Sequence, residues 1–219
     1  MNIHSGLLHY MTVFIGFLAM LNPFGILPLF IGMVEDLDSK TARWMAFRAS
    51  FSAFLIITCF CIFGHLIFRL FGITIPAFQI AGGIIVFFIG YHMLNGEESK
   101  IKVQKDMSPD ELKQALSNIA VTPLGMPLLA GPGTIATAMN FVGSDKSLTN
   151  VIVVILLFAL ICFLTFLLFL SAKKIAGLLG VGLIKIITRV MGLILTVIAI
   201  QMLIMGIIGA VKLYTSIDI

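Results

Sequence analysis

Long apolar stretches separated by short polar ones dominate the pattern of this chain. A helix needs about 20 apolar residues to cross a membrane, and six stretches approach or exceed that length. They cover, approximately, Leu7–Val34, Arg48–Arg69, Pro76–Leu94, Thr122–Val142, Val151–Leu170 and Val190–Val211. The pattern predicts an all-α integral membrane protein with six transmembrane helices. The whole chain, 1–219, would form a single transmembrane domain.

Two of these stretches are interrupted by proline and glycine, at Asn22–Pro28 and at Thr122–Thr134. Proline removes a backbone donor and clashes with the preceding turn, while glycine adds backbone freedom, so neither stretch should form one regular helix. Their other residues are almost all apolar, unlike those of a water-exposed turn. We therefore predict breaks in the first and fourth helices at membrane depth. Broken backbone is tolerated there only inside protein or along a cavity.

The two interruptions also indicate an internal repeat. Asn22–Gly25 (NPFG) matches Thr122–Gly125 (TPLG), and Phe78–Leu94 aligns without gaps with Ile187–Leu203. The first repeat would cover about 7–95 and the second about 119–212, joined by a polar cytoplasmic loop at about 96–118. Because each repeat has three helices, the two must cross the membrane in opposite directions, as inverted repeats.

Transporters built from inverted repeats bind their substrate near the midplane, at helices broken in equivalent positions. The N-terminus of a half-helix there favours an anionic group such as a carboxylate. The candidate substrate-binding residues are Asn22, Pro23, Gly25, Thr122, Pro123, Gly125, Gly131, Pro132, Gly133 and Thr134. Two structural alternatives stay open: Asn22 would only cap its own helix, and the glycines would only let helices pack closely.

Two further polar residues are candidates for gating or helix contact. Gln79 lies near the predicted outer end of the third helix, where a gate or a hydrogen-bonded helix contact is expected. Arg189 lies near the cytoplasmic start of the sixth helix. It would extend to the membrane interface, cap helix carbonyls, or take part in gating.

Composition and charge fit this interpretation. The chain is 60% hydrophobic and 11% charged, whereas soluble domains carry roughly 25% charged residues. The basic residues flank the apolar stretches, so the pI near 9.1 does not indicate a nucleic-acid partner. Eleven of the 14 Lys and Arg residues fall on one predicted side: Lys40, Arg43, Arg48, Lys100, Lys102, Lys105, Lys113, Lys173, Lys174, Lys185 and Arg189. That side should be cytoplasmic, which places both termini outside.

Other functions are argued against by missing motifs. No Asp or Glu lies within an apolar run, so the carboxylate relay of proton pumps is not expected. No nucleotide-binding, zinc-protease or serine-hydrolase motif is found, so we expect neither an enzyme nor a cofactor or metal site. Cys59, Cys61 and Cys162 lie in apolar runs and are interpreted as small buried hydrophobic residues. Proton or sodium coupling and homo-oligomer formation are left open.

Four stretches of the chain resemble the MarC family of bacterial inner-membrane proteins, which includes the SnatA-type small neutral amino acid transporters of the LysE-type superfamily. They are NPFGILPLF (Asn22–Phe30), IAGGI (Ile80–Ile84), PLLAGPGTI (Pro127–Ile135) and ITRVMGL (Ile187–Leu193). The resemblance implies six transmembrane helices in the inner membrane and transport of glycine and alanine.

The sequence thus predicts a secondary transporter of small neutral solutes, working by alternating access as one repeat rocks against the other. Its partners would be the lipid bilayer and a small neutral amino acid. The alternatives are a non-transporting scaffold or assembly subunit and, less favoured, a drug efflux protein. A transporter requires a polar, water-sized cavity between residues 22–28 and 122–134, whereas a scaffold would be dry and filled there.

Overall fold

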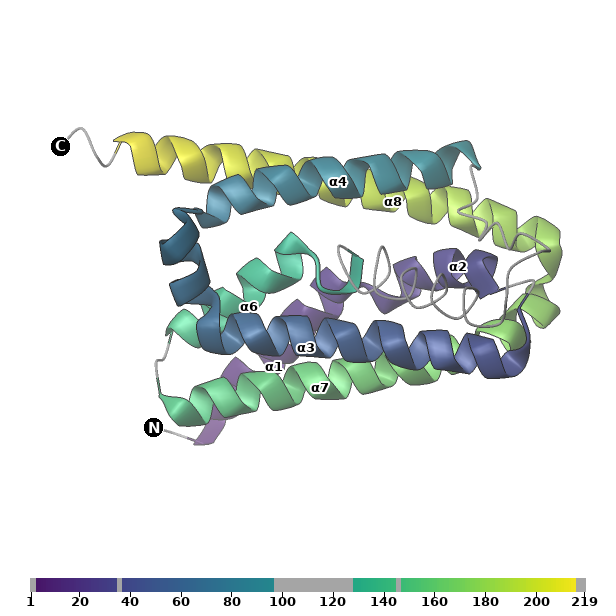
Figure 1. Ribbon diagram of the computed structural model, residues 1–219, viewed down its shortest axis with the longest axis horizontal. Helices are drawn as coiled ribbons and strands as arrows, with labels where there is room; N and C mark the ends of the chain where they lie inside the picture. The colour runs from purple at the N-terminus through teal and green to yellow at the C-terminus, as the bar shows by residue number, and fades with distance from the viewer. Residues whose placement is uncertain (1–2, 35–36, 97–127, 145–146, 216–219) are drawn as a thin grey trace.

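The computed structural model describes residues 3–34, 37–96, 128–144 and 147–215, and its regular structure there is entirely helical (Figure 1). The helices are α1 (Ile3–Leu21), α2 (Pro23–Val34), α3 (Ser39–Phe71), α4 (Ile75–Asn95), α6 (Pro132–Ser144), α7 (Leu148–Leu170) and α8 (Ala172–Thr215). Within these ranges five segments are long and apolar enough to span a membrane. The all-helical membrane class is confirmed. The fourth predicted helix is described only from Leu128 onward, so its full span lies partly outside the described residues.

The helix α3 is longer than its apolar run, which was expected to begin at Arg48. It begins at Ser39 because the Asp38 carboxylate accepts a hydrogen bond from the Lys40 backbone N–H, at 2.9 Å, and others from Thr41. The hydrogen bond from the Thr41 hydroxyl is the main reason that the pKa of Asp38 is lowered. Gly72, with φ of 61°, ends the helix in the left-handed region that glycine tolerates.

The last helix also begins earlier than its apolar run. The predicted start was about Val190, but α8 begins at Ala172 and bends at Gly180, whose φ of 71° and ψ of 159° are not helical. The Lys173 ammonium group donates a hydrogen bond to the Leu37 carbonyl, which ties the start of α8 to the connection before α3. Polar residues that lie between the fifth and sixth predicted spans are therefore helical.

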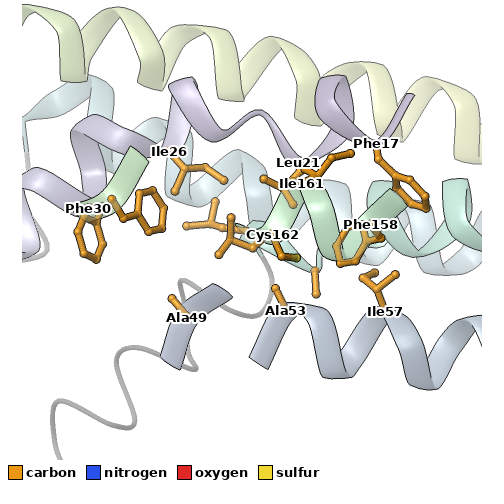
Figure 2. Packing of buried hydrophobic residues seen from close by; sticks show 14 of the residues in the cluster. Phe17, Leu21, Ile26, Phe30, Ala49, Ala53, Ile57, Phe158, Ile161 and Cys162 are labelled. Carbon is orange, nitrogen blue, oxygen red and sulfur yellow. The ribbon is translucent and has the colours of Figure 1, made fainter. Parts of the chain in front are cut away.

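The main apolar core lies where α1, α2, α3 and α7 meet (Figure 2). Phe30 stacks on Phe169 with ring centroids 4.2 Å apart, and Phe17 meets Phe158 edge-on at 5.0 Å. Such aromatic pairs contribute about 0.5–1.5 kcal/mol each beyond the burial of their area. Much of the buried face of α3 in its first half consists of alanine, and small residues of this kind allow helices to pack closely: Ala42, Ala46, Ala49 and Ala53.

The helices α4 and α8 form a second, glycine-packed pair (Figure 1). A Cβ built on Gly83 would lie 3.0 Å from the Ala199 carbonyl oxygen, and one built on Gly90 would lie 2.8 Å from that of Gly192. The two helices therefore run antiparallel. The alignment of Phe78–Leu94 with Ile187–Leu203 pairs Gly83 with Gly192 and Gly90 with Ala199. One contact is thus the image of the other under the predicted repeat.

The same correspondence holds for whole helices. The second helices of the two predicted repeats, α3 and α7, pack on each other, as do the third helices, α4 and α8. In Figure 1 the α4–α8 pair runs along one side of the molecule and α3 and α7 along the other, with α2 and α6 between them. Large apolar side chains are exposed along α3, α4, α7 and α8, as expected of faces turned to lipid.

Candidate functional site

The first predicted break lies at Asn22, between α1 and α2. Its φ of 43° makes it the only non-glycine residue with a positive φ among the described residues. Its backbone N–H donates to the Leu18 carbonyl and completes α1, at 3.0 Å. Its side-chain Oδ1 accepts a hydrogen bond from the Gly25 N–H, at 3.2 Å. Asn22 is therefore the N-cap of α2, with Pro23 at the first helical position.

The cap requires a glycine at position 25. A Cβ on Gly25 would overlap the Asn22 side-chain amide, so a larger residue would displace the group that accepts its own N–H. Pro23 and Gly25 are both buried. The first break thus supports the structural alternative for these residues: they shape the helix start.

The second break lies at Gly131, where the chain enters α6. The Ile135 N–H donates to the Gly131 carbonyl at 2.9 Å, and Pro132 takes the first helical position as Pro23 does in α2. Thr134 is 1% exposed. Thr122, Pro123 and Gly125, the other candidates in this stretch, lie outside the described residues.

The two breaks meet at a small cavity, here called the inner cavity. Its volume is about 30 Å³, enough for about two water molecules. It is lined by Asn22 and Gly131–Thr134 from the breaks, and by Val86, Leu195 and Ile198 from α4 and α8, among others. Stretches more than one hundred residues apart in the sequence therefore face one space, as the repeat predicted. Pro23 and Gly25 do not line it.

The electrostatics of the inner cavity come from the backbone. The helices α2 and α6 both begin at its wall, and each helix N-terminus carries a partial positive charge of roughly half a unit. No charged side chain lines the cavity among the described residues. A carboxylate placed there would gain about 0.3–2 kcal/mol from each helix terminus. At about 30 Å³, the cavity as it stands is too small for a whole amino acid.

A larger cleft of about 740 Å³ adjoins the inner cavity. Its polar lining comes from α3, α4, α6 and α8 and consists of His65, Gln79, Thr137, Asn140 and Gln201. Of these residues, the sequence identified Gln79, as a candidate for gating or helix contact. It missed His65, Asn140 and Gln201 as site residues. The available signal was that Asn140 and Gln201 are amides within apolar runs.

The remaining candidate, Arg189, lies away from both spaces. Its guanidinium is 3.2 Å from a Cβ built on Gly96, the residue that caps the C-terminal end of α4. A positive charge there complements the partial negative charge of the helix end. This position favours the carbonyl-capping interpretation of Arg189 over a gating role.

Two substitutions of Asn22 separate its backbone role from its side-chain role. Asn22→Ala loses the cap and must hold a left-handed φ, so we expect it to be less stable than the wild type by about 2 kcal/mol. Asn22→Gly tolerates that φ and should lose only a few tenths of a kcal/mol. Equilibrium unfolding in detergent measures the difference. If the two variants were equally stable, the left-handed cap would be the wrong description of this break.

Comparison with known proteins gives a match to the family described as MarC family integral membrane protein over residues 7–211. The chain is 39% identical to the UPF0056 membrane protein YvbG of Bacillus subtilis over 206 residues, which are 93% of this chain and 96% of that one. It is 38% identical to a UPF0056 membrane protein of Pyrococcus horikoshii, covering 92% and 95% of the two chains. A UPF0056 membrane protein of Aquifex aeolicus is 35% identical, over 93% and 94%. No solved structure matches the chain.

Proposed function

The chain belongs to the MarC family of integral membrane proteins, and we propose that it is a secondary transporter of small neutral solutes, with glycine and alanine as its substrates. The resemblance drawn from four sequence motifs is confirmed by a match over nearly the whole chain. The names of the relatives state that they are membrane proteins and assign no substrate. The proposal therefore rests on the site itself.

The observation that carries the proposal is the inner cavity between the two helix breaks. Two half-helices, α2 and α6, begin at one uncharged cavity, which favours a substrate with a carboxylate and no net charge. The residues of the two breaks that line this cavity are Asn22 and Gly131–Thr134. Binding between breaks of this kind is the arrangement of transporters built from inverted repeats.

The paired helices support the inverted repeat and refine its motion. The contacts of α3 with α7 and of α4 with α8 join equivalent helices of the two repeats. Each of these two helix pairs would then contain one helix from each repeat. Alternating access would move the α4–α8 pair against the remaining helices, rather than one whole repeat against the other. The cleft, which lies between these units, would close in that motion.

The distribution of the basic residues indicates on which side of the membrane the cleft would open. The cleft is lined by residues near the C-terminal ends of α3 and α6 and the N-terminal end of α4, including His65, Gly143 and Ile75. With the cytoplasmic side assigned by the basic residues, these ends face the outside of the bacterial inner membrane, as both termini would. A coupling ion would be held by backbone carbonyls or neutral side chains, because no Asp or Glu lies within an apolar run.

Two alternatives are less well supported. A scaffold would have filled the space between the breaks, where the inner cavity lies. A drug efflux protein needs an aromatic-lined pocket, but no Phe, Tyr or Trp lines the cleft among the described residues. The substrate is therefore expected to be small.

Solute counterflow in proteoliposomes tests the proposal. Vesicles loaded with unlabelled glycine should accumulate labelled glycine and alanine above the level of protein-free vesicles, and should not accumulate leucine or a bulky cationic dye. Uptake of neither amino acid would remove the transport function. Uptake of the dye alone would favour drug efflux.

A further inference from the structure

The inner cavity and the cleft share a boundary. Of the residues that the structure describes, four line both spaces: Met20 at the end of α1, Gly133 in α6, and Ile198 and Met202 in α8. In Figure 1, α6 lies between α8 and the α1–α3 side of the molecule. Any solute that passes from the cleft to the helix breaks must cross this neck.

We propose that Met20 and Met202 form a thioether gate in the neck, which sets the size of solute that reaches the helix breaks. This deepens, and rests on, the proposed transport function. The Met20 Sδ lies 3.3 Å and the Met202 Sδ 3.7 Å from the position of a Cβ built on Gly133. The two side chains thus converge on the one residue of the neck that has no side chain. They close the space that Gly133 leaves open.

Methionine suits a gate that opens without backbone movement. Its side chain is unbranched, with three rotatable bonds and a polarisable sulfur, so it adapts its shape at low cost. Met20 is 49% exposed, which leaves it space to rotate toward the cleft. Rotamer changes of exposed side chains take picoseconds to nanoseconds. Solute would therefore exchange quickly between the cleft and the inner cavity. Its access from the other side of the membrane would require movement of helices.

The gate also accounts for the small size of the inner cavity. A space of about 30 Å³ is too small for glycine, but rotation of Met20 and Met202 would join it to the cleft. The solute would then occupy the volume vacated by the two thioethers. Substrates whose side chain is larger than a methyl group would compete with Ile198 and the methionine stems for that volume. Solutes of the size of glycine and alanine would therefore be the substrate class that passes the gate.

The cleft supplies a matched control. Met205 lines the cleft one helical turn beyond Met202 and does not line the inner cavity. Shortening Met205 should widen the cleft without opening the neck. A comparison of Met202→Ala with Met205→Ala therefore separates the loss of the gate from the general effect of removing a methionine from α8.

A thiol-labelling experiment tests the gate without using transport. Val86 lines the inner cavity only and is 6% exposed, and cysteine is close to valine in size. Val86→Cys in the detergent-solubilised full chain is treated with methyl methanethiosulfonate, and its modification is followed by mass spectrometry with the native cysteines in place. We expect Met20→Ala or Met202→Ala to raise the labelling rate at least tenfold, and Met205→Ala to leave it within twofold.

Two results would overturn the gate. Labelling at equal rates with and without Met20 and Met202 would mean that neither closes the neck. An equal increase of the labelling rate in Met205→Ala would mean that the rate rises because α8 packs less tightly, and not because the neck opens. Counterflow adds the functional readout, in which Met202→Ala should accumulate valine while the wild type does not. Failure of wild-type glycine counterflow would remove the transport function and leave the labelling result unaffected, so the two failures are distinguishable.

Discussion

Gly82→Val should lower the free energy of unfolding by about 3 kcal/mol, the upper end of the usual cost of overpacking. Gly82 lies on α4, where a Cβ would overlap the ring of Pro132 at the start of α6. That ring cannot rotate away, because proline fixes its own backbone. The two valine methyl groups must therefore push α4 away from α6. The α4–α8 wall of the inner cavity would move with it.

Gly32→Val is the matched control for this prediction. A Cβ on Gly32, in α2, meets no atom of the described residues within 4 Å, so the same substitution there should change stability by less than about 0.5 kcal/mol. Equilibrium unfolding in mixed detergent micelles, followed by circular dichroism, compares the two variants. Equal stability of Gly82→Val and Gly32→Val would show that α4 does not rest on Pro132.

Gly133→Val should abolish transport and leave the fold intact. Its Cβ would lie 3.3 Å from the Met20 Sδ and 3.7 Å from the Met202 Sδ, which are the flexible parts of long side chains. They can move by the few tenths of an ångström that the Cβ needs. The valine methyl groups would then fill the neck between the cleft and the inner cavity. We expect the initial rate of glycine counterflow to fall at least tenfold, with an unfolding free energy within about 1 kcal/mol of the wild type.

Gly177→Val serves as the control for the transport measurement. Gly177 lies in the first part of α8 and lines neither space. In the part of the chain that the structure describes, no atom lies within 4 Å of its Cβ position. This variant should transport glycine at the wild-type rate. If Gly133→Val folded and transported equally well, the solute would not pass through the neck.

The helix breaks were predictable because their signals are local. Asn22-Pro23 and Gly131-Pro132 place a helix-breaking proline in an apolar run, and the structure begins α2 and α6 at those prolines. The convergence of the two breaks was expected from the predicted repeat, whose signal also lies in the sequence. Thr122, Pro123 and Gly125 lie outside the described residues, so their part in the site stays a prediction.

The cleft and the neck were not predictable from one sequence. In membrane helices apolar residues face both lipid and protein, so the hydrophobic pattern does not indicate which face lines a cavity. Met20, Met202 and His65 are ordinary residues of apolar runs until three separate helices bring them together. The contact of Gly82 with Pro132 joins residues fifty positions apart that lie in non-equivalent helices, so the repeat does not predict it either.

The helix ends were underestimated for a related reason. Apolar runs mark the part of a helix that lies in lipid, and caps decide where the helix ends. Asp38 extends α3 beyond the run that begins near Arg48, and α8 continues through Lys173 and Lys185 on the side assigned to the cytoplasm. Outside lipid, polar residues with good helix propensity do not end a helix.

The most direct test of a solute site between the two breaks is protection of Val86→Cys by glycine. The cysteine would lie in the wall of the inner cavity, and its rate of reaction with methyl methanethiosulfonate is measured with saturating glycine, with leucine, and with no solute. Glycine should slow the reaction at least threefold, and leucine should leave it unchanged. An unchanged rate in glycine would contradict the account.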